Sequence, residues 1–370
     1  MDNFAFIIHP IDPKRDVQRK FPVLGKVLPV RMINFLSRFF PPLYISHITG
    51  IRSSATGKEI EGWFVACPFT PQRMMTLPAR IVYRKIIATA KKAQSLGAQL
   101  VGLGAYTSVV GDGGVTIGHM VEIPVTTGDS YTVAIAIEAL KKAAKQMEID
   151  LSSATAAVVG ATGTIGAVSA ELLAQAVPQI ILIGRNSDRL GLVKARCEAA
   201  GAEVQVATDL NALRQADLVL TVTSAMDSII EPEHIKSGAV VCDVARPRDV
   251  SRQVIEQRDD VLVIEGGMVE VPGEVDFHFN FGFPPRMAYA CMAETMVLAL
   301  DGRYESYSLG KDLTIEQVQE IDRIARYHGF TLGGFRSFEN AVSAEQIEQI
   351  KLKARSKRLG LKTVAAISAA

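Results

Sequence analysis

The sequence predicts an α/β protein in which an N-terminal α/β domain precedes a Rossmann-type doubly wound parallel sheet, with helices at the C-terminal end. Two observations predict this class. In the second half of the chain, short apolar runs rich in β-branched residues alternate with helical stretches, the order typical of a parallel sheet. Residues 154–187 also run in βαβ order, and Gly160, Gly163 and Gly166 mark the first turn.

The predicted elements follow from hydrophobic periodicity and from the glycine and proline positions between them. Ahead of the glycine turn, we expect a strand at 4–10, a hairpin-like piece at 59–69, a helix at 80–99, a buried strand at 100–106, a loop at 107–120 and a helix at 131–147. Beyond it, we expect strands at 203–207, 217–225, 239–245 and 261–267, then helices from Pro285 to Leu300 and from Thr314 to Tyr327. The 150 residues before the turn suffice for a domain of their own.

The glycine turn predicts a dinucleotide site. Its Gly-x-x-Gly-x-x-Gly spacing is a variant of the dinucleotide fingerprint, which brings backbone N–H groups close to a pyrophosphate at a helix N-terminus. A glycine triplet alone is weak evidence for a dinucleotide site, but a triplet between a predicted strand and a predicted helix is strong evidence for one. The expected cofactor-binding residues in the turn and after the fourth strand are Gly160, Thr162, Gly163, Thr164, Ile165, Gly166, Thr223 and Ser224.

The end of the second βαβ strand selects the cofactor. An Asp or Glu there is typical of NAD, because it binds the ribose 2′-hydroxyl. Here the strand ends in Gly184, Arg185, Asn186 and Ser187, with a guanidinium in place of an acid. A guanidinium pairs with a 2′-phosphate. We therefore expect NADPH, with Arg185, Asn186 and Ser187 as binding residues; the alternative is a solvated Arg185 and acceptance of either cofactor.

Composition excludes several classes of function. The net charge of +1 gives no global reason to expect nucleic acid. No apolar run is long enough to span a membrane, and the opening residues MDNFAF lack the features of a signal peptide. The four cysteines are scattered, without zinc-binding spacing, so we expect no metal and a cytoplasmic, reduced protein.

Two features of the surface are unusual for such a protein. Residues 1–50 and the basic tail 335–370 each carry seven Lys or Arg against three Asp or Glu, which suits an acidic partner, anionic lipid or ordinary solvated surface. Residues 21–42 interleave Lys26, Arg31 and Arg38 with large apolar residues, and Pro29 is expected to break the segment in two. Three alternatives remain open: peripheral contact with a membrane, a cover over an apolar acyl tunnel, or a helix packed on its own domain.

Cys291 is the candidate nucleophile. A helix is expected to start at Pro284 and Pro285, which places Cys291 within its first two turns. The helix N-terminus and Arg286 would then favour the thiolate. The alternative is a buried thiol acting as a small hydrophobe, which is the interpretation for Cys242; Cys67 and Cys197 have no activating neighbours.

Several motifs give the chain a family resemblance. They are Ser54-Ala-Thr-Gly-Lys58, Gly104-Ala-Tyr-Thr-Ser108, Thr127-Gly128, Val159-Gly-Ala-Thr-Gly-Thr-Ile-Gly166, Gly266-Gly267-x-Val269-Glu270, Ala290-Cys-Met-Ala-Glu-Thr-Met296 and His328-Gly329-Phe330. Over most of residues 4–330 the sequence resembles the cyanobacterial long-chain acyl-acyl-carrier-protein reductases, which form fatty aldehydes from acyl thioesters with NADPH. It departs from that family at residues 21–40, in a shorter loop between Glu270 and Cys291, and in an extra tail beyond residue 335.

The resemblance implies roles for the parts. The cysteine corresponding to Cys291 carries the acyl group as an enzyme thioester in that family. The expected domains are then 1–150 for substrate and acyl binding, 151–284 for NADPH, 285–334 for the helical region with Cys291, and 335–370 for the tail. Acyl-carrier protein or acyl-CoA would be the carrier, with an aldehyde-consuming enzyme as a further partner. His278, Glu294, Lys58 and Thr107 are candidate proton donors; His9 matches the opening strand of the family without a known role, and His47, His119 and His234 are expected at the surface or in caps.

Two other functions stay open. One is an NADP-dependent dehydrogenase of the shikimate or amino-acid type, which acts on a small polar substrate without a covalent step. The other is a binding protein whose Rossmann domain senses NADPH. Cys291 separates these alternatives from the thioester reductase, because neither of them needs a nucleophilic thiol.

Overall fold

The computed structural model describes residues 2–360, which fold as two compact units. Each unit combines two separate stretches of the described chain: residues 2–132 with 268–333, and residues 133–267 with 334–360. The bounds expected from sequence cut the chain into consecutive stretches at residues 150, 284 and 334. The difference arises because the chain, after completing the sheet of the second unit, goes back to the first.

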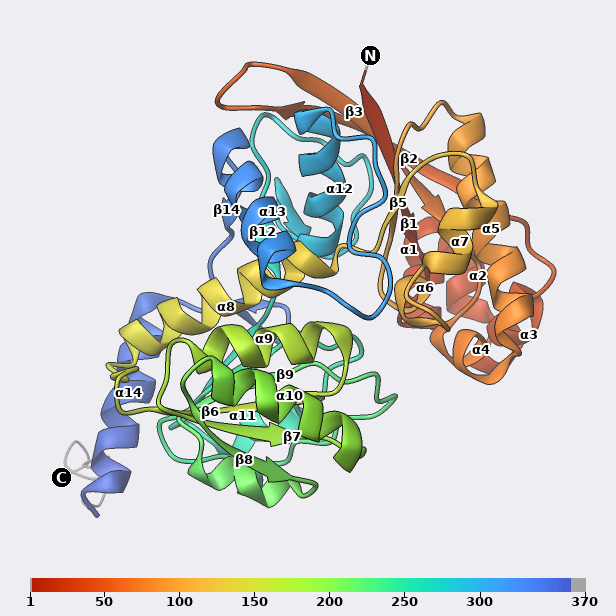
Figure 1. The fold of residues 1–370 in the computed structure, drawn as a ribbon. Coiled ribbons are helices and arrows are strands. Elements are labelled where there is room, and N and C mark those ends of the chain that lie inside the picture. Colours follow the sequence, from red (N-terminus) through yellow and green to blue (C-terminus); the bar gives the residue numbers. More distant parts are fainter. Residues whose placement is uncertain (1, 361–370) are drawn as a thin grey trace. The chain divides into compact units, whose positions relative to one another are not determined.

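The first unit contains a five-stranded sheet in the order β2-β3-β1-β4-β5 (Figure 1). Its strands are β1 (Asn3–Ile8), β2 (Leu43–Arg52), β3 (Glu59–Ala66), β4 (Val101–Leu103) and β5 (Val125–Thr126). β2 and β3 form an antiparallel hairpin, whereas β3, β1, β4 and β5 are parallel neighbours. Residues that follow β1, β4 and β5 therefore meet at one edge of the sheet.

The helices of the first unit lie between and after these strands. They are α1 (Pro13–Lys20), α2 (Pro22–Val27), α3 (Val30–Ser37), α4 (Pro71–Thr76), α5 (Ala79–Ser95), α6 (Tyr106–Val109), α7 (Val115–Met120), α12 (Ala290–Asp301) and α13 (Ile315–His328). The predicted break at Pro29 is confirmed, because α2 ends before this proline and α3 begins after it.

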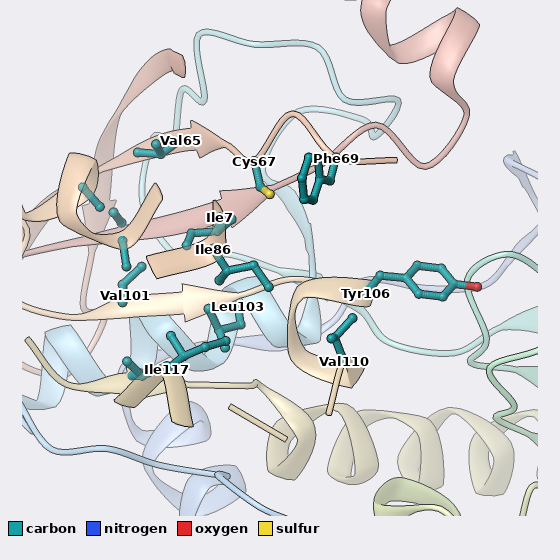
Figure 2. Packing of buried hydrophobic residues seen from close by; sticks show 14 of the residues in the cluster. Ile7, Val65, Cys67, Phe69, Ile86, Val101, Leu103, Tyr106, Val110 and Ile117 are labelled. Carbon is teal, nitrogen blue, oxygen red and sulfur yellow. The ribbon is translucent and has the colours of Figure 1, made fainter. Parts of the chain in front are cut away.

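The sheet of the first unit is covered on both faces. Along β1, Ala5 and Ile7 point into a buried cluster that includes Ile86 of α5 (Figure 2). α12 packs against the opposite face, where a Cβ added to Gly102 of β4 would lie 2.1 Å from Oγ1 of Thr295. Glycine at this position thus lets α12 lie directly on the strand.

The segment that goes back to the first unit also brings a small antiparallel sheet in the order β13-β12-β14. Its strands are β12 (Met268–Glu270), β13 (Met287–Tyr289) and β14 (Thr331–Leu332). β13 leads directly into α12, so the pairing of β12 with β13 sets the start of this helix.

The second unit has the expected Rossmann sheet. Six parallel strands lie in the order β11-β10-β9-β6-β7-β8 (Figure 1). β6 and β9 are neighbours in the sheet, although two strands, β7 and β8, lie between them in the chain. The strands are β6 (Thr155–Val159), β7 (Gln179–Ile183), β8 (Glu203–Ala207), β9 (Leu218–Thr221), β10 (Val240–Asp243) and β11 (Leu262–Glu265). The order reverses between β6 and β9, which is the point where such sheets bind nucleotides.

Helices and the tail complete the second unit. They are α8 (Asp129–Gln146), whose first residues belong to the first unit, α9 (Thr164–Ala174), α10 (Ser187–Ala199), α11 (Arg252–Gln257), the 3₁₀ turns η1 (Leu210–Gln215) and η2 (Pro232–His234), the hairpin β15 (Arg336–Ser337) and β16 (Asn340–Ala341), and α14 (Ala344–Arg358). Basic residues of α14 pair with acids of the same unit: Lys351 with Glu148, and Lys357 with Asp259. These pairs make the described part of the tail a packed element; Lys362 lies outside the described residues.

Two predicted elements are wrong in detail. The expected loop at 107–120 contains α6 and α7, two helices too short to give a periodic signal. The helix expected from Pro285 begins only at Ala290, because Arg286 adopts a left-handed φ of 64° and the next three residues form β13. Cys291 is therefore the second residue of α12 and lies closer to the helix start than expected.

No helix among residues 2–360 is long and apolar enough to cross a membrane.

Candidate active site

Cys291 differs from the other three cysteines in its exposure. Cys67, Cys197 and Cys242 are buried, as expected for core residues, whereas Cys291 is partly exposed. Every other residue of α12 from Ala290 to Leu300 is buried. A fixed, buried helix thus presents this thiol at its first turn.

Gly128 brings a second segment of the first unit onto Cys291. Its φ is 79°, and a Cβ added to it would lie 2.3 Å from both Cα and Cβ of Cys291. Any other residue would meet both an unfavourable backbone conformation and a steric overlap. The Thr127-Gly128 motif therefore allows the turn after β5 to lie directly against the cysteine.

Glu294 holds this turn in place from the next turn of α12. Its carboxyl group is fully buried and accepts hydrogen bonds from the hydroxyl of Thr126, the backbone N–H of Tyr131 at 2.8 Å and the hydroxyl of Ser308 at 2.8 Å. Burial raises the pKa of Glu294. With three donors on its oxygens, this side chain is an anchor for the turn and has little freedom to exchange protons with a substrate.

Asp129 is the ionisable group of the site that the motifs did not reveal. It is the first residue of α8 and follows Gly128 directly. Burial, together with the charge of Glu294, raises the pKa of Asp129 to about 8. A carboxyl group with such a pKa exchanges protons near neutral pH, as a general acid or base must.

The expected activation of the thiol by Arg286 is wrong. Burial and then the negative charge of Asp129 raise the pKa of Cys291 to about 12. Arg286 forms an ion pair with Glu270 at 3.1 Å, and its charge does not offset these effects. Cys291 is consequently a neutral thiol near neutral pH, and a base must remove its proton before it can attack a carbonyl.

The other three candidate proton donors have structural partners. Nζ of Lys58 donates to the carbonyl oxygens of Ala299 and Leu300 and pairs with Asp2, so it caps the C-terminal end of α12. The side chain of His278 contacts Asp276 and the carbonyl oxygen of His47. The hydroxyl of Thr107 donates to the carbonyl oxygen of Gly104. Glu294, one turn further along α12, is the candidate whose charge acts on Cys291.

His9 follows β1 at the edge of the sheet where β4 and β5 also end. Its Nε2 accepts the backbone N–H of Tyr106 at 3.1 Å, beside Ala105, which has a φ of 46°. Burial lowers the pKa of His9 to about 4, so the ring is neutral. His9 thus supports the strained start of α6. Of the three histidines expected at the surface or in caps, His234 is confirmed as a cap, since its Nδ1 accepts the N–H of Glu231.

The glycine turn of the second unit has the geometry of a phosphate-binding loop. Gly160 has a φ of 84°, and a Cβ on Gly166 would lie 2.2 Å from the carbonyl oxygen of Gly160. Gly163 is exposed and precedes α9 without a side chain that caps the helix. The first N–H groups of α9 are therefore available to an anion, and Thr162, Thr164 and Ile165 beside them are partly exposed.

The loop after β9 meets this turn. A Cβ on Gly160 would lie 2.5 Å from the carbonyl oxygen of Val222. Thr223 donates both its N–H and its hydroxyl to the buried carboxylate of Asp249, so it shapes the loop and leaves Ser224 exposed beside it. No spacing in the sequence pointed to Asp249.

The end of β7 exposes the residues expected to select the cofactor. Arg185, Asn186 and Ser187 are all exposed. Oδ1 of Asn186 accepts the N–H of Arg189 at 2.9 Å and caps α10. Arg185 lies in the same turn. It is the exposed cation closest in sequence to the end of β7.

Comparison with known proteins agrees with this arrangement. A family model described as shikimate / quinate 5-dehydrogenase matches residues 141–265. "Aminotransferase PigE" of a Serratia species is 31% identical over 81% of this chain, which spans only 35% of PigE. The "Long-chain acyl-[acyl-carrier-protein] reductase" of Synechococcus elongatus is 29% identical over 78% of this chain and 87% of its own length. Glutamyl-tRNA reductase of Saccharophagus degradans is 30% identical over 35% of this chain and 32% of its own.

The sheet order and the glycine turn are those of an NAD(P)-binding Rossmann domain, and the chain is similar to glutamyl-tRNA reductase and, over residues 141–265, to the shikimate / quinate 5-dehydrogenase family. The resemblance to the cyanobacterial long-chain acyl-acyl-carrier-protein reductases, expected from the motifs, is confirmed by the match to the Synechococcus protein.

The contact between Gly128 and Cys291 predicts a large loss of stability in Gly128→Ala. The left-handed backbone and the overlap should together cost about 2–4 kcal/mol of unfolding free energy, measured by urea denaturation. Gly334→Ala is the matched control, because Gly334 has a φ of 86° with nothing within 4 Å of an added Cβ. Equal losses in the two variants would contradict the contact.

The raised pKa of Asp129 predicts a pH-dependent stability. The folded chain binds this proton more tightly than the unfolded chain, so the stabilisation is complete below the ordinary pKa of 3.8 and is lost as the pH rises through about 8. Asp129→Asn should lack this contribution. As the pH rises across that range, the unfolding free energy of the wild type should therefore fall relative to that of Asp129→Asn. A difference that stays constant with pH would show that the pKa of Asp129 is not raised.

Proposed function

We propose that this protein reduces a long-chain acyl thioester to the fatty aldehyde with NADPH, through an acyl thioester on Cys291. The observation that carries the proposal is the partly exposed thiol of a buried helix, placed beside a carboxyl group whose pKa lies near neutrality. The similarity to the Synechococcus reductase supports the substrate class.

Asp129 is the base that the neutral thiol requires. In its ionised form it takes the proton of Cys291 while the sulfur attacks the acyl carbon. The bond between the acyl carbon and the carrier sulfur then breaks, and the carrier thiolate leaves with the proton that Asp129 returns. This half-reaction forms one thioester for each one broken and consumes no net proton.

When bound, NADPH supplies a hydride to the acyl carbon. The tetrahedral adduct on Cys291 then collapses to the aldehyde, and the thiolate that leaves regains a proton that Asp129 takes up from solvent. Glu294 keeps the turn with Asp129 against the cysteine through both halves of the cycle. Overall, one thioester, one hydride and one proton give one aldehyde and one carrier thiol.

The residues of the second unit fit the cofactor. The N–H groups at the start of α9 would hold the pyrophosphate, together with the exposed Gly163. Arg185, the exposed cation after β7, would bind the 2′-phosphate and so select NADPH. Ser224 lies after β9 at the reversal of strand order and would contact the same cofactor.

An aromatic row in the first unit suits a long acyl chain. Phe64, Phe277, Phe281, Phe283 and Tyr289 follow one another at ring distances of 5.8, 5.1, 5.6 and 4.4 Å. The last ring belongs to the N-cap residue of α12, two positions before the cysteine. An alkyl chain on that thiol would thus have apolar surface beside it.

The carrier is acyl-carrier protein or coenzyme A, since both present the same thioester to a nucleophile. A reactive aldehyde product implies an enzyme that consumes it. The second candidate function is an NADP-dependent dehydrogenase acting on a small polar substrate, which the shikimate / quinate 5-dehydrogenase match favours. That match covers residues 141–265 and does not extend to Cys291.

The covalent step predicts an acyl-enzyme that accumulates without NADPH. Intact-mass spectrometry after incubation with a long-chain acyl thioester should find one acyl group on the wild type and none on Cys291→Ala. Cys197→Ala, which removes a buried thiol, should behave as the wild type. NADPH added later should remove the label as aldehyde. Aldehyde formation at the wild-type rate by Cys291→Ala would overturn the proposal.

The cofactor assignment predicts that Arg185→Asp shifts preference from NADPH towards NADH. Loss of a phosphate contact and a carboxylate opposite that phosphate should cost about 2–4 kcal/mol for NADPH. The measurement is the ratio of kcat/KM for the two cofactors. Lys194→Asp makes the same charge change further along α10 and should leave the ratio unchanged. If Arg185→Asp also leaves it unchanged, another residue selects the cofactor.

A further inference from the structure

The first unit carries an exposed apolar and basic patch on α2, α3 and the chain that follows them. Val23, Phe35 and Phe39 are 74%, 58% and 65% exposed. The other large exposed apolar residues of the patch are Leu24, Val27, Val30, Met32, Phe40 and Tyr44. A monomeric protein rarely exposes so many large apolar side chains within one short segment.

This exposure belongs to helices that are fixed on the unit. Ile33 and Ser37 form the buried side of α3, and Asn34 contacts α4 by accepting the hydroxyl of Thr70 at 2.6 Å. Lys85 of α5 donates to the carbonyl oxygens of Arg38 and Phe40. The expectation of a helix packed on its own domain therefore describes only the inner side of α3.

The outward side of α3 combines apolar and cationic groups. At 100° per residue, Arg31, Phe35 and Arg38 fall within about 60° of arc, and Phe39 lies next to them. Lys14 and Lys26 are also exposed in this part of the chain. The two acids nearby serve the local structure: Asp12 caps α1, and Asp16 pairs with Arg19 at 3.0 Å.

We propose that this patch docks the protein on an anionic lipid bilayer, with the apolar side chains of α2 and α3 in the interface. The transfer of Phe, Val and Leu side chains from water to the boundary between headgroups and acyl chains is favourable. Each nearby Lys or Arg adds attraction to anionic headgroups. The surplus of basic residues favours an anionic surface. The exposed apolar side chains on the helices favour a surface that such side chains can enter, as they can enter a lipid bilayer. This proposal is independent of the proposed reaction, because binding to vesicles requires neither substrate nor cofactor.

Vesicle flotation tests the proposal with the full-length protein. Wild type should float with vesicles of phosphatidylcholine and phosphatidylglycerol, and far less with phosphatidylcholine alone. Phe35→Ser/Phe39→Ser should reduce binding at least about tenfold, since two exposed aromatic anchors are lost. Arg31→Gln/Arg38→Gln should also bind more weakly, with a smaller dependence on salt. Leu192→Ser is the control, because Leu192 is an equally exposed apolar residue of α10.

Three results would overturn the proposal. The first is wild-type protein that does not float with anionic vesicles. The second is flotation that Phe35→Ser/Phe39→Ser leaves unchanged while its thermal unfolding matches the wild type. The third is a lipid-free dimer that the same double variant converts to a monomer, because the patch would then be an interface between copies of the chain. If Phe35→Ser/Phe39→Ser no longer floats with vesicles but still forms the acyl-enzyme, the result supports docking and leaves the proposed reaction intact.

Discussion

The arrangement of the first unit depends on the burial of one carboxyl group. Glu294 is fully buried among mainly apolar residues of α12, where an unpaired carboxyl group would cost several kcal/mol. Its oxygens take their hydrogen bonds from Thr126, Tyr131 and Ser308, which come from the end of β5, the start of α8 and the loop after α12. Satisfying this single side chain draws three segments together around the first turn of α12.

The same arrangement determines the electrostatics of the cysteine. Gly128 lets the turn approach without a side chain in between, and the charge of Asp129, when it is ionised, disfavours the thiolate of Cys291. Two carboxyl groups in one buried site cannot both ionise freely, so their environments separate their tasks. Glu294 is held by three donors and fixes the geometry, whereas Asp129 has the proton affinity suited to transfer.

Much of this could be predicted from the sequence, and the remainder has physical reasons. The six strands of the second unit were predictable because each is a short apolar run, and Gly160 and Gly166 were recognisable because backbone approach there tolerates no side chain. The raised pKa of Asp129 was not predictable, since it depends on burial and on the charge of Glu294, which lies far away in the chain. The nearby Arg286 suggested a stabilised thiolate, and only the fold reveals that its partner is Glu270.

The raised pKa of Cys291 has a consequence for the durability of the protein. Peroxide and soft metal ions react with a thiolate, and a protonated thiol is a poor target for both. By withholding the charge until a base takes the proton, the surroundings of Cys291 protect the sulfur from oxidation to the sulfenic and sulfinic acids. Burial and the two carboxyl groups keep the thiol protonated, and they thereby make it a poorer target for oxidants between catalytic cycles.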